Sequence, residues 1–202
     1  MNPPDPRIGS AFLQAGLGYG GYCLPKDIPA FEQFAQQAGY DFPLLREVAR
    51  INEEALTTVF DRVRESLWNL EGKRVAVLGL AYKPATDDIR LSPALEIARR
   101  LHEGGAHVAA YDPRVSDASS EELDWLEIAP DAYEAAGGAH CVVIGTAWDE
   151  FGDIDLARLR AAVAYPIVVD GRNLFDPAAM REAGFDYYPV GRPFVIRDAA
   201  PR

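Results

Sequence analysis

The spacing of the hydrophobic residues changes near Gly72, and this change divides the chain into two regions. Before it, apolar residues from Leu45 to Leu67 recur every three or four positions, which predicts one amphipathic helix from about residue 44 to 70. The stretch IPAFEQFAQQAG, residues 28–39, predicts a shorter helix ahead of it. After Gly72, short β-branched runs alternate with helical stretches. We therefore expect a helical region over residues 1–72 and an α/β domain over residues 73–202.

The long helix would span roughly 40 Å at about 1.5 Å per residue, so it is expected to connect the two regions. Its apolar stripe needs a partner, either the core of the protein or a partner helix. Asn52 lies within this helix, and we interpret it as a polar contact between helices and not as a ligand-binding residue.

The second region reads as strands and helices in alternation. Buried strands are predicted at residues 74–81, 107–113, 140–146 and 166–171, with helices at 92–105, 130–137, 154–163 and 176–184, before a final apolar segment at 185–190. Ser92 is the expected N-cap of the first of these helices, with Pro93 at its first position and Gly104 at its end. This alternation predicts a Rossmann-like, doubly wound parallel sheet.

Ligands of such sheets bind at the carboxyl ends of the strands, which draws attention to the loops that follow them. These are LAYKPATDDIRLS at residues 80–92, YDPR at 111–114 and DGRNLFDP at 170–177. The first loop follows a single glycine, Gly79, and carries Lys83 and Arg90 where a dinucleotide fingerprint would continue as GxGxxG. The domain is therefore a poor match to a self-sufficient NAD site.

Composition excludes several classes of function. The net charge of -11 argues against a nucleic-acid partner, because phosphate backbones are bound by clustered Lys and Arg. No run of 18 apolar residues and no signal-like start appear, so no membrane segment is predicted and a cytoplasmic location is expected. The two cysteines are far apart and have no CxxC or Cys/His cluster around them, so neither a metal site nor a disulfide framework is expected.

The segment GLGYGGYCLPKD, residues 16–27, combines a glycine-rich loop with a cysteine and an aspartate. Four glycines in six residues indicate positive φ angles or a ligand pressed against the backbone. We expect Pro25 at the first position of a helix, which places Cys23 just before the helix N-terminus, where the partial positive charge favours a thiolate. Cys141 lies inside an apolar strand and is interpreted as a small core residue.

Three segments together carry a family resemblance: GLGYGGYCLPKD, VAVLGLAYKPATDDIRLSPALE and VVDGRNLFDP. In order and spacing they resemble the second half of the nucleotide sugar dehydrogenases of the UDP-glucose/GDP-mannose dehydrogenase family, over nearly the whole chain. The family's first half, with its GxGxxG domain and a catalytic lysine and asparagine, has no counterpart in these residues. The resemblance thus implies a truncated chain or the product of a split gene.

The resemblance implies a chemistry for the cysteine loop. Family members oxidise the C6 alcohol of a nucleotide sugar to an aldehyde and then to a carboxylate, using two NAD molecules. Cys23 would attack the aldehyde and carry a thioester, which water then hydrolyses. Asp27 would orient the cysteine or position that water.

The same resemblance implies binding roles. Gly20 and the neighbouring glycines would let the backbone lie against the hexose. The sugar and uridine pocket would be lined by Phe12, Leu13 and Tyr19, while Arg7 would reach the substrate of a neighbouring subunit in a homodimer formed through the long helix. Lys83 and Arg172 would contact the UDP-sugar. Arg90 would contact the pyrophosphate of NAD, held mainly by the missing half, since arginine's planar fork suits phosphate oxygens.

Three alternatives stay open. Within the family, a GDP-mannose dehydrogenase is the second candidate, because its cysteine loop also reads CLPKD. In a different class, the chain is a nucleotide-sugar-binding and dimerising module without activity of its own, because nothing in it positions a nicotinamide. If a separate chain supplies the NAD domain, both readings hold. A cysteine hydrolase needs a histidine base, and no histidine lies near Cys23 in the sequence.

Overall fold

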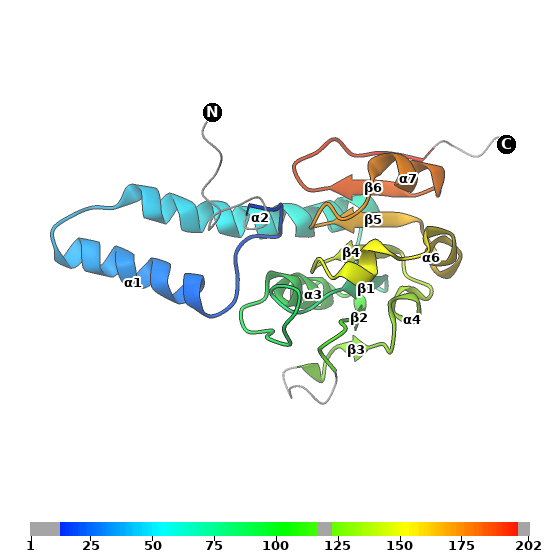
Figure 1. The fold of residues 1–202 in the computed structure, drawn as a ribbon, viewed down its shortest axis with the longest axis horizontal. Helices are drawn as coiled ribbons and strands as arrows, with labels where there is room; N and C mark the ends of the chain where they lie inside the picture. The colour runs from blue at the N-terminus through cyan, green and yellow to red at the C-terminus, as the bar shows by residue number, and fades with distance from the viewer. Residues whose placement is uncertain (1–12, 117–122, 198–202) are drawn as a thin grey trace.

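The computed structural model describes residues 13–116 and 123–197, and its centre is one parallel sheet (Figure 1). Within these residues the sheet has six strands in the order β3-β2-β1-β4-β5-β6. All neighbouring strands pair in parallel; the strands are β1 (Arg74–Leu78), β2 (His107–Tyr111), β3 (Glu127–Ile128), β4 (Cys141–Ile144), β5 (Ile167–Asp170) and β6 (Asp186–Pro189). This is the strand order of a doubly wound Rossmann fold, which confirms the predicted fold class.

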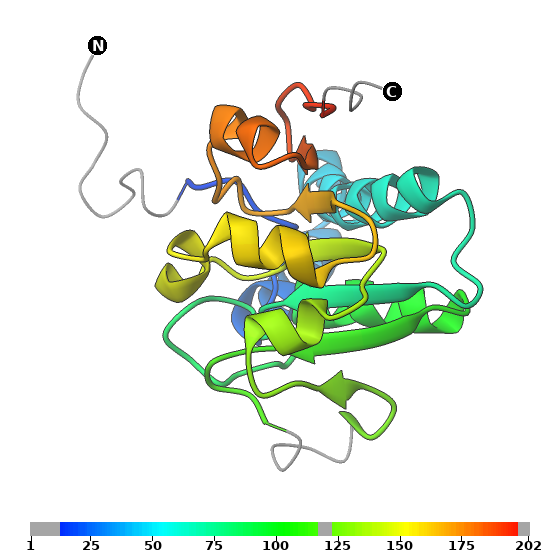
Figure 2. The same cartoon turned by 90° about the vertical axis from the view of Figure 1, so that its right-hand side faces the viewer.

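Helices cover both faces of the sheet (Figure 2). The long helix α2 (Pro43–Leu67) and α3 (Pro93–Glu103) pack against each other on one face. The other face is covered by α4 (Ala132–Ala136), α6 (Leu156–Ala162) and α7 (Pro177–Glu182), while the short helix α5 (Asp149–Gly152) lies beside the carboxyl ends of the strands. The chain reverses its direction of winding between β1 and β4, so the crevice of a doubly wound sheet lies at the carboxyl ends of these two strands.

The core lies between the sheet and its helices, and the second half of α2 belongs to it. The central strands β1, β4 and β5 are buried along almost their whole length, as expected for a sheet covered on both faces. The α2 side chains in this core are Leu56, Val59, Val63 and Leu67. Thus α2 is joined to the α/β domain by apolar packing along its second half.

The first half of α2 and the preceding helix α1 (Cys23–Gln37) form a hairpin that projects away from the sheet (Figure 1). α1 contains no buried residue. Several large apolar side chains on this hairpin are exposed, namely Leu24, Phe31, Phe34, Tyr40, Leu44, Val48 and Ile51. The hairpin therefore buries little of its apolar surface in this chain.

Local sequence signals place some elements accurately and miss others. Ser92 caps α3 by accepting a hydrogen bond from the backbone N of Leu95 at 3.5 Å, with Pro93 in the first turn and Gly104 as the C-cap, as predicted. The two-residue strand β3 and the single-turn helix α5 were not predicted, since elements this short have no periodicity to detect.

Candidate functional site

The glycine-rich segment 16–22 lies across the carboxyl edge of the sheet. Leu17 is buried and anchors it there. A Cβ added to Gly171, just after β5, would overlap the Leu17 side chain and would lie 2.9 Å from the carbonyl oxygen of Ile144 at the end of β4. Only a glycine at 171 leaves room for this anchor. The segment predicted to bind a ligand is thus held at the edge where doubly wound sheets bind theirs.

Arg172 meets one end of this segment. A Cβ on Gly16 would overlap the guanidinium of Arg172, so the missing side chain at Gly16 makes room for that arginine. The Arg172 side chain is half-buried, and its Nε is buried without a hydrogen-bond partner in the described part of the protein. Burial lowers the pKa of Arg172 from its ordinary value, and the charge of Asp170 opposes this shift. An unpaired buried donor on a cation is a feature that an anionic ligand would satisfy.

The other end of the segment packs against the loop after β1 and the start of α3. A Cβ on Gly20 would overlap the carbonyl oxygen of Leu91 and lie 2.5 Å from Cδ of Pro93. Gly21 has a φ of 74°, and a Cβ there would lie 2.8 Å from the ring of Tyr82. The bare face of Gly20, which the resemblance assigned to a hexose, is therefore used for contact with this protein loop.

Asn52 fixes the middle of the segment. Its Oδ1 accepts a hydrogen bond from the backbone N of Tyr19 at 2.6 Å, and its Nδ2 donates to the Tyr19 carbonyl at 3.2 Å. The expectation of a contact between helices was wrong in its partner, because Asn52 bridges α2 to the glycine-rich loop. Its side-chain amide satisfies both backbone groups of Tyr19, as a neighbouring strand would.

Cys23 is the first residue of α1, and its side chain is exposed. The helix begins two residues before Pro25, so the prediction that Cys23 precedes the helix was wrong by that margin. Pro25 is tolerated in the first turn because the first N–H groups of a helix have no intrahelical partner. The carboxylate of Asp27 lies 3.1 Å from Lys26 Nζ, and no hydrogen bond joins Asp27 to Cys23 within the described residues.

Lys83 and Arg90 both lie exposed on the loop that follows β1. The guanidinium of Arg90 pairs with both oxygens of Asp88, at 2.9 and 2.7 Å, and lies 5.3 Å from the ring centroid of Tyr22. Arg90 is therefore next to the residue that precedes Cys23. Lys83 Nζ lies 5.4 Å from the ring centroid of Tyr82, the residue that contacts Gly21.

A cavity of about 630 Å³ opens between the glycine-rich loop, the middle of α2, the loop after β1 and the start of α3. Of the predicted site residues its lining includes Tyr19 and Arg90. Lys83, Cys23 and Arg172 are outside the lining, so the cavity does not unite the predicted site. Its volume falls in the range of small-molecule sites.

The strand-end position that binds ribose in dinucleotide domains is occupied by protein contacts here. Asp112 follows β2, is buried, and accepts from the backbone N of Leu80 and Ala81 at 2.7 and 3.0 Å and from Nε1 of Trp148 at 3.0 Å. Gly79 is packed against Thr146, which lies 2.5 Å from where a Cβ would be. Because protein groups already occupy them, these strand-end residues do not fit a dinucleotide.

Asp112 and Asp170 are the polar residues that the sequence reasoning did not single out as important to this edge. Each is a buried aspartate at the carboxyl end of a strand and accepts hydrogen bonds from backbone amides of the loop that follows it; Asp112 also accepts from the loop after β1. A detectable signal existed, since in both cases an aspartate directly follows an apolar run.

Some predicted residues receive no support from the geometry. Arg7 and Phe12 lie outside the described residues. Leu13 is described but 68% exposed.

Within the described ranges, no helix is both long and apolar enough to cross a membrane. The same ranges contain no group of three or more His, Cys, Asp or Glu side chains arranged to hold a metal ion.

Two family models match this chain. The UDP-binding domain of the UDP-glucose/GDP-mannose dehydrogenase family matches residues 76–177, and the central domain of that family matches residues 3–54. The α/β sheet and the cysteine loop thus define one class of protein: the chain belongs to the UDP-glucose/GDP-mannose dehydrogenase family.

Similar proteins of known name are sugar dehydrogenases. Over 192 residues the chain is 40% identical to UDP-glucose 6-dehydrogenase TuaD of Bacillus subtilis (strain 168), covering 95% of this chain and 42% of that protein. It is 42% identical over 183 residues to UDP-glucose 6-dehydrogenase AglM of Haloferax volcanii, covering 91% of this chain and 41% of that protein. The chain therefore spans about two fifths of the length of these relatives.

Solved structures give the same picture. A UDP-glucose dehydrogenase from Pyrobaculum islandicum superimposes with a TM-score of 0.78 at 36% identity, covering 92% of this chain and 40% of that one. A GDP-mannose dehydrogenase from Pseudomonas aeruginosa gives a TM-score of 0.67 at 25% identity, covering 83% of this chain and 39% of that one.

Proposed function

We propose that this chain is the part of a UDP-glucose 6-dehydrogenase that binds the UDP-sugar and supplies the catalytic cysteine. One observation supports this most. A single anchored loop, residues 16–22, has at one end Arg172, whose buried Nε has no hydrogen-bond partner among the described residues, and at the other end the exposed Cys23. A ligand with phosphates near Arg172 and a sugar near Cys23 would use both ends of this loop.

In the proposed reaction, the sulfur of Cys23 bonds to the C6 aldehyde carbon of the sugar. After oxidation of this adduct the product is a thioester on Cys23, and attack by water releases the carboxylate and restores the thiol. Asp27 lies one helical turn from Cys23, so its carboxylate is on the same side of α1 and suits the role of positioning that water. Substrate or conformational change would have to displace Lys26 from Asp27.

The oxidation from alcohol to carboxylate removes two hydrides, which NAD bound elsewhere in the enzyme would accept. The described sheet does not fit a dinucleotide, so we propose that NAD is held mainly by a part of the enzyme outside this chain. Arg90, which is exposed beside Tyr22, would bind the pyrophosphate of NAD. To do so it would have to exchange its ion pair with Asp88 for the phosphate oxygens. Without that other part, the chain is expected to bind nucleotide sugar and to show no dehydrogenase activity.

The names of the relatives favour UDP-glucose over GDP-mannose. The UDP-glucose dehydrogenases described above are 36–42% identical to the chain, whereas the GDP-mannose dehydrogenase is 25% identical. GDP-mannose dehydrogenase remains the second candidate within the family.

Isothermal titration calorimetry of the chain with UDP-glucose, GDP-mannose and NAD in separate titrations tests the proposed site. We expect heat with UDP-glucose and none with NAD. Arg172→Ala should abolish that heat, whereas Arg181→Ala, which removes an exposed arginine on α7, should leave it unchanged. Equal binding by the two variants would refute the site. Binding of GDP-mannose in place of UDP-glucose would support the second candidate.

The proposed homodimer would use the exposed stripe at the start of α2. Leu44, Val48 and Ile51 recur at helical spacing and are exposed in the single chain. The dimer contact predicted along the whole of residues 44–70 would therefore involve only the first half of this helix, because the second half is packed on the sheet. Ile51→Glu should lower the sedimentation coefficient to that of a monomer. Ala49→Glu adds the same charge at another exposed position of α2 and should leave the dimer intact.

If the unmodified chain sediments as a monomer at all concentrations, the homodimer proposal fails for this chain. Mixing it with a chain that carries an NAD domain then tests the separate-partner alternative. The cytoplasmic location stays a prediction.

A further inference from the structure

The carboxylate of Asp170 is a hub of hydrogen bonds at the end of β5. It is fully buried. Its Oδ1 accepts from the backbone N of Arg172 at 2.8 Å, and its Oδ2 accepts from the backbone N of Leu174 at 2.7 Å and of Phe175 at 3.2 Å. The phenol of Tyr187 donates to the same Oδ2 at 2.8 Å. The loop thus wraps around one side chain.

These contacts fix the backbone on both sides of Asn173 and directly at Arg172. Asn173 has a φ of 53°, in the left-handed region, which asparagine tolerates better than most other non-glycine residues. The Asn173 Nδ2 also donates to the carbonyl of Val190 at 2.9 Å. The short loop after β5 therefore turns through one left-handed residue, and Asp170 accepts hydrogen bonds from the backbone amides of both of its neighbours, Arg172 and Leu174.

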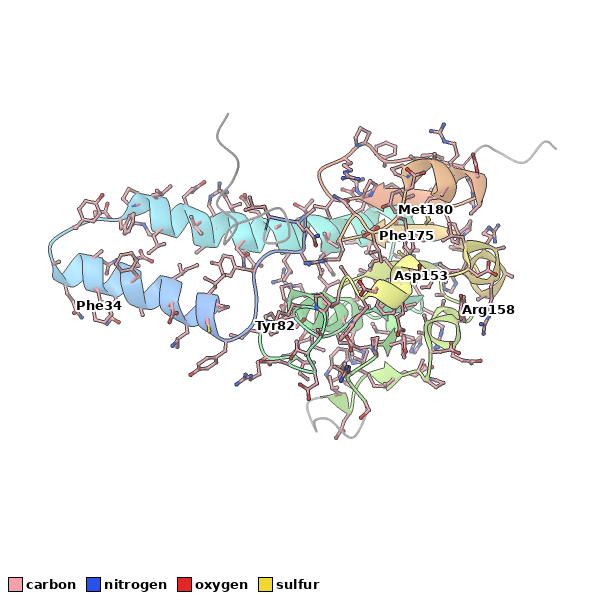
Figure 3. All side chains as sticks on the ribbon, viewed as in Figure 1. Phe34, Tyr82, Asp153, Arg158, Phe175 and Met180 are labelled. Atoms are coloured by element: carbon pink, nitrogen blue, oxygen red, sulfur yellow. The ribbon has the colours of Figure 1, made fainter. Side chains whose placement is uncertain are left out.

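Tyr187 connects this loop to the neighbouring strand. It is fully buried in β6, pairs opposite Val168 of β5, and its hydroxyl also lies 3.1 Å from the carbonyl oxygen of Phe175. Phe175, labelled in Figure 3, lies at the end of the loop. Its side chain is buried. Burial and the charge of Asp170 raise the pKa of the Tyr187 phenol, so it stays a donor over the whole physiological range. The hydroxyl of Tyr187 therefore donates a hydrogen bond to the same carboxylate that accepts from the backbone amides of the loop.

The charge of Asp170 has a second consequence. Arg172 is half-buried, its Nε has no partner, and no ion pair of its guanidinium exists within the described residues. Burying a cation without a partner is costly. The nearby negative charge of Asp170 offsets part of this cost. The carboxylate of Asp170 already accepts hydrogen bonds from four other donors, so it does not form a direct ion pair with the guanidinium of Arg172. The arginine is thereby kept charged and free.

We propose that Asp170 and Tyr187 are positioning residues that hold Arg172 ready for an anionic ligand, without touching that ligand themselves. This inference rests on the proposed function, in which Arg172 contacts the nucleotide diphosphate. The alternative is that the two residues only stabilise the fold.

The affinity of the chain for UDP distinguishes these two roles. Tyr187→Phe removes the hydroxyl and keeps the buried ring. Tyr188→Phe removes a hydroxyl from the next residue of the same strand, where no bond to Asp170 exists. Measured by calorimetry at a temperature where both variants are fully folded by circular dichroism, Tyr187→Phe should weaken UDP binding about tenfold, the effect of one charge-assisted hydrogen bond. Tyr188→Phe should bind UDP like the unmodified chain.

Asp170→Asn is the stronger variant, because it removes the charge and turns one acceptor into a donor facing other donors. We expect it to lose UDP binding beyond detection if it folds. Unchanged UDP affinity in folded Tyr187→Phe would overturn the proposal, since a role in stability alone predicts that result.

A second measurement separates this proposal from the proposed function. Hydrogen exchange of the backbone amides of Arg172, Leu174 and Phe175 should be faster in Tyr187→Phe than in Tyr188→Phe, without any ligand. If the unmodified chain does not bind UDP, the proposed nucleotide site fails. Faster exchange confined to these amides still supports the positioning of the loop, whereas equal exchange in both variants would overturn that as well.

Discussion

The α1–α2 hairpin and the α/β body differ in how much of their own apolar surface they bury. In the body, Leu78, Ile97, Leu101 and Val143 are fully buried between the sheet and its helices. In the hairpin, α1 has no buried residue, and Phe34 lies 65% exposed near the end of the hairpin farthest from the sheet (Figure 3). The body buries most of its large apolar side chains within itself, whereas the hairpin leaves many of its own exposed.

The difference teaches where function depends on assembly. Arg172 lies within the body beside buried residues, so the proposed nucleotide affinity is expected to be measurable with this chain alone. Cys23 begins the poorly covered helix α1, directly after the loop that Leu17 and Asn52 hold against the body. We therefore expect binding to survive conditions that loosen the hairpin and catalysis to require a partner surface.

The largest expected contrast is in thiol reactivity. Cys23 is exposed on the hairpin, whereas Cys141 is fully buried in β4 and reacts only when the body opens. With a disulfide reagent at neutral pH, Cys23 should react on the order of 100-fold faster or more than Cys141. Absorbance should show one fast thiol in the unmodified chain and none in Cys23→Ser. Two thiols reacting at similar rates would mean that the body is not the more stable region.

Substitutions of leucine by alanine measure the same contrast in stability. Leu101 is fully buried in α3, so Leu101→Ala should cost about 2–5 kcal/mol of unfolding free energy. Leu44 is 67% exposed at the start of α2, so in the monomer Leu44→Ala should stay within about 0.5 kcal/mol, whereas burial in the proposed homodimer would raise this cost. Urea unfolding followed by circular dichroism compares the two. A comparable loss in both variants would show that the hairpin is covered in solution, by a second copy or by its own rearrangement.

Sequence patterns predicted the body better than the site. The parallel sheet, the caps of α3 and the cysteine loop follow from periodicity, caps and turn residues within a few positions of each other. The predicted start of α1 was wrong because proline is tolerated at any position of the first helical turn, so Pro25 alone does not specify which residue begins the helix. The exact start of the helix depends on how the glycine-rich loop packs against the start of α3, which local sequence does not reveal.

What the sequence left hidden depends on contacts between distant residues. Asn52 and Tyr19 are 33 positions apart, and nothing near Asn52 in the chain marks it as the support of a loop. Asp170 could be noticed as an aspartate after a strand. Its bond to Tyr187 depends on the register of β5 and β6, which hydrophobic spacing does not specify. The glycines were expected to face a ligand, but those at 16 and 20 make room for protein atoms.

Alkaline pH should weaken the body through Cys141. Burial raises the pKa of this thiol from 9.0 to about 12. The unfolded chain releases the proton at the lower pH, so the stabilising contribution is complete below about pH 9 and is lost between about pH 9 and 12. In a Cys23→Ala background, adding Cys141→Ala should remove a loss on the order of 1 kcal/mol between pH 8 and 10. If both proteins lose stability in parallel over this range, Cys141 is not the buried titrating group.

The smallest expected effect concerns the edge of the body, where β3 is a strand of two residues held by an ion pair. Both guanidinium nitrogens of Arg74 lie 2.7 Å from the carboxylate oxygens of Glu127. This pairing lowers the pKa of Glu127, so its contribution is present above the unfolded pKa near 4.5 and is lost as the pH falls below it. The Glu127 side chain is 57% exposed, so solvent screening limits Glu127→Gln to about 0.5 kcal/mol at pH 7.

Salt and pH separate this pair from the packing around it. The loss caused by Glu127→Gln should shrink in 1 M NaCl and vanish near pH 3, because both conditions remove the attraction in the unmodified chain. Asp41→Asn, which breaks the ion pair with Arg46 beside the exposed turn of the hairpin, provides the comparison and should change stability less than Glu127→Gln does. If the hairpin variant had the larger effect, the hairpin would contribute to the cooperative unit, and the division into a self-sufficient body and a dependent hairpin would be wrong.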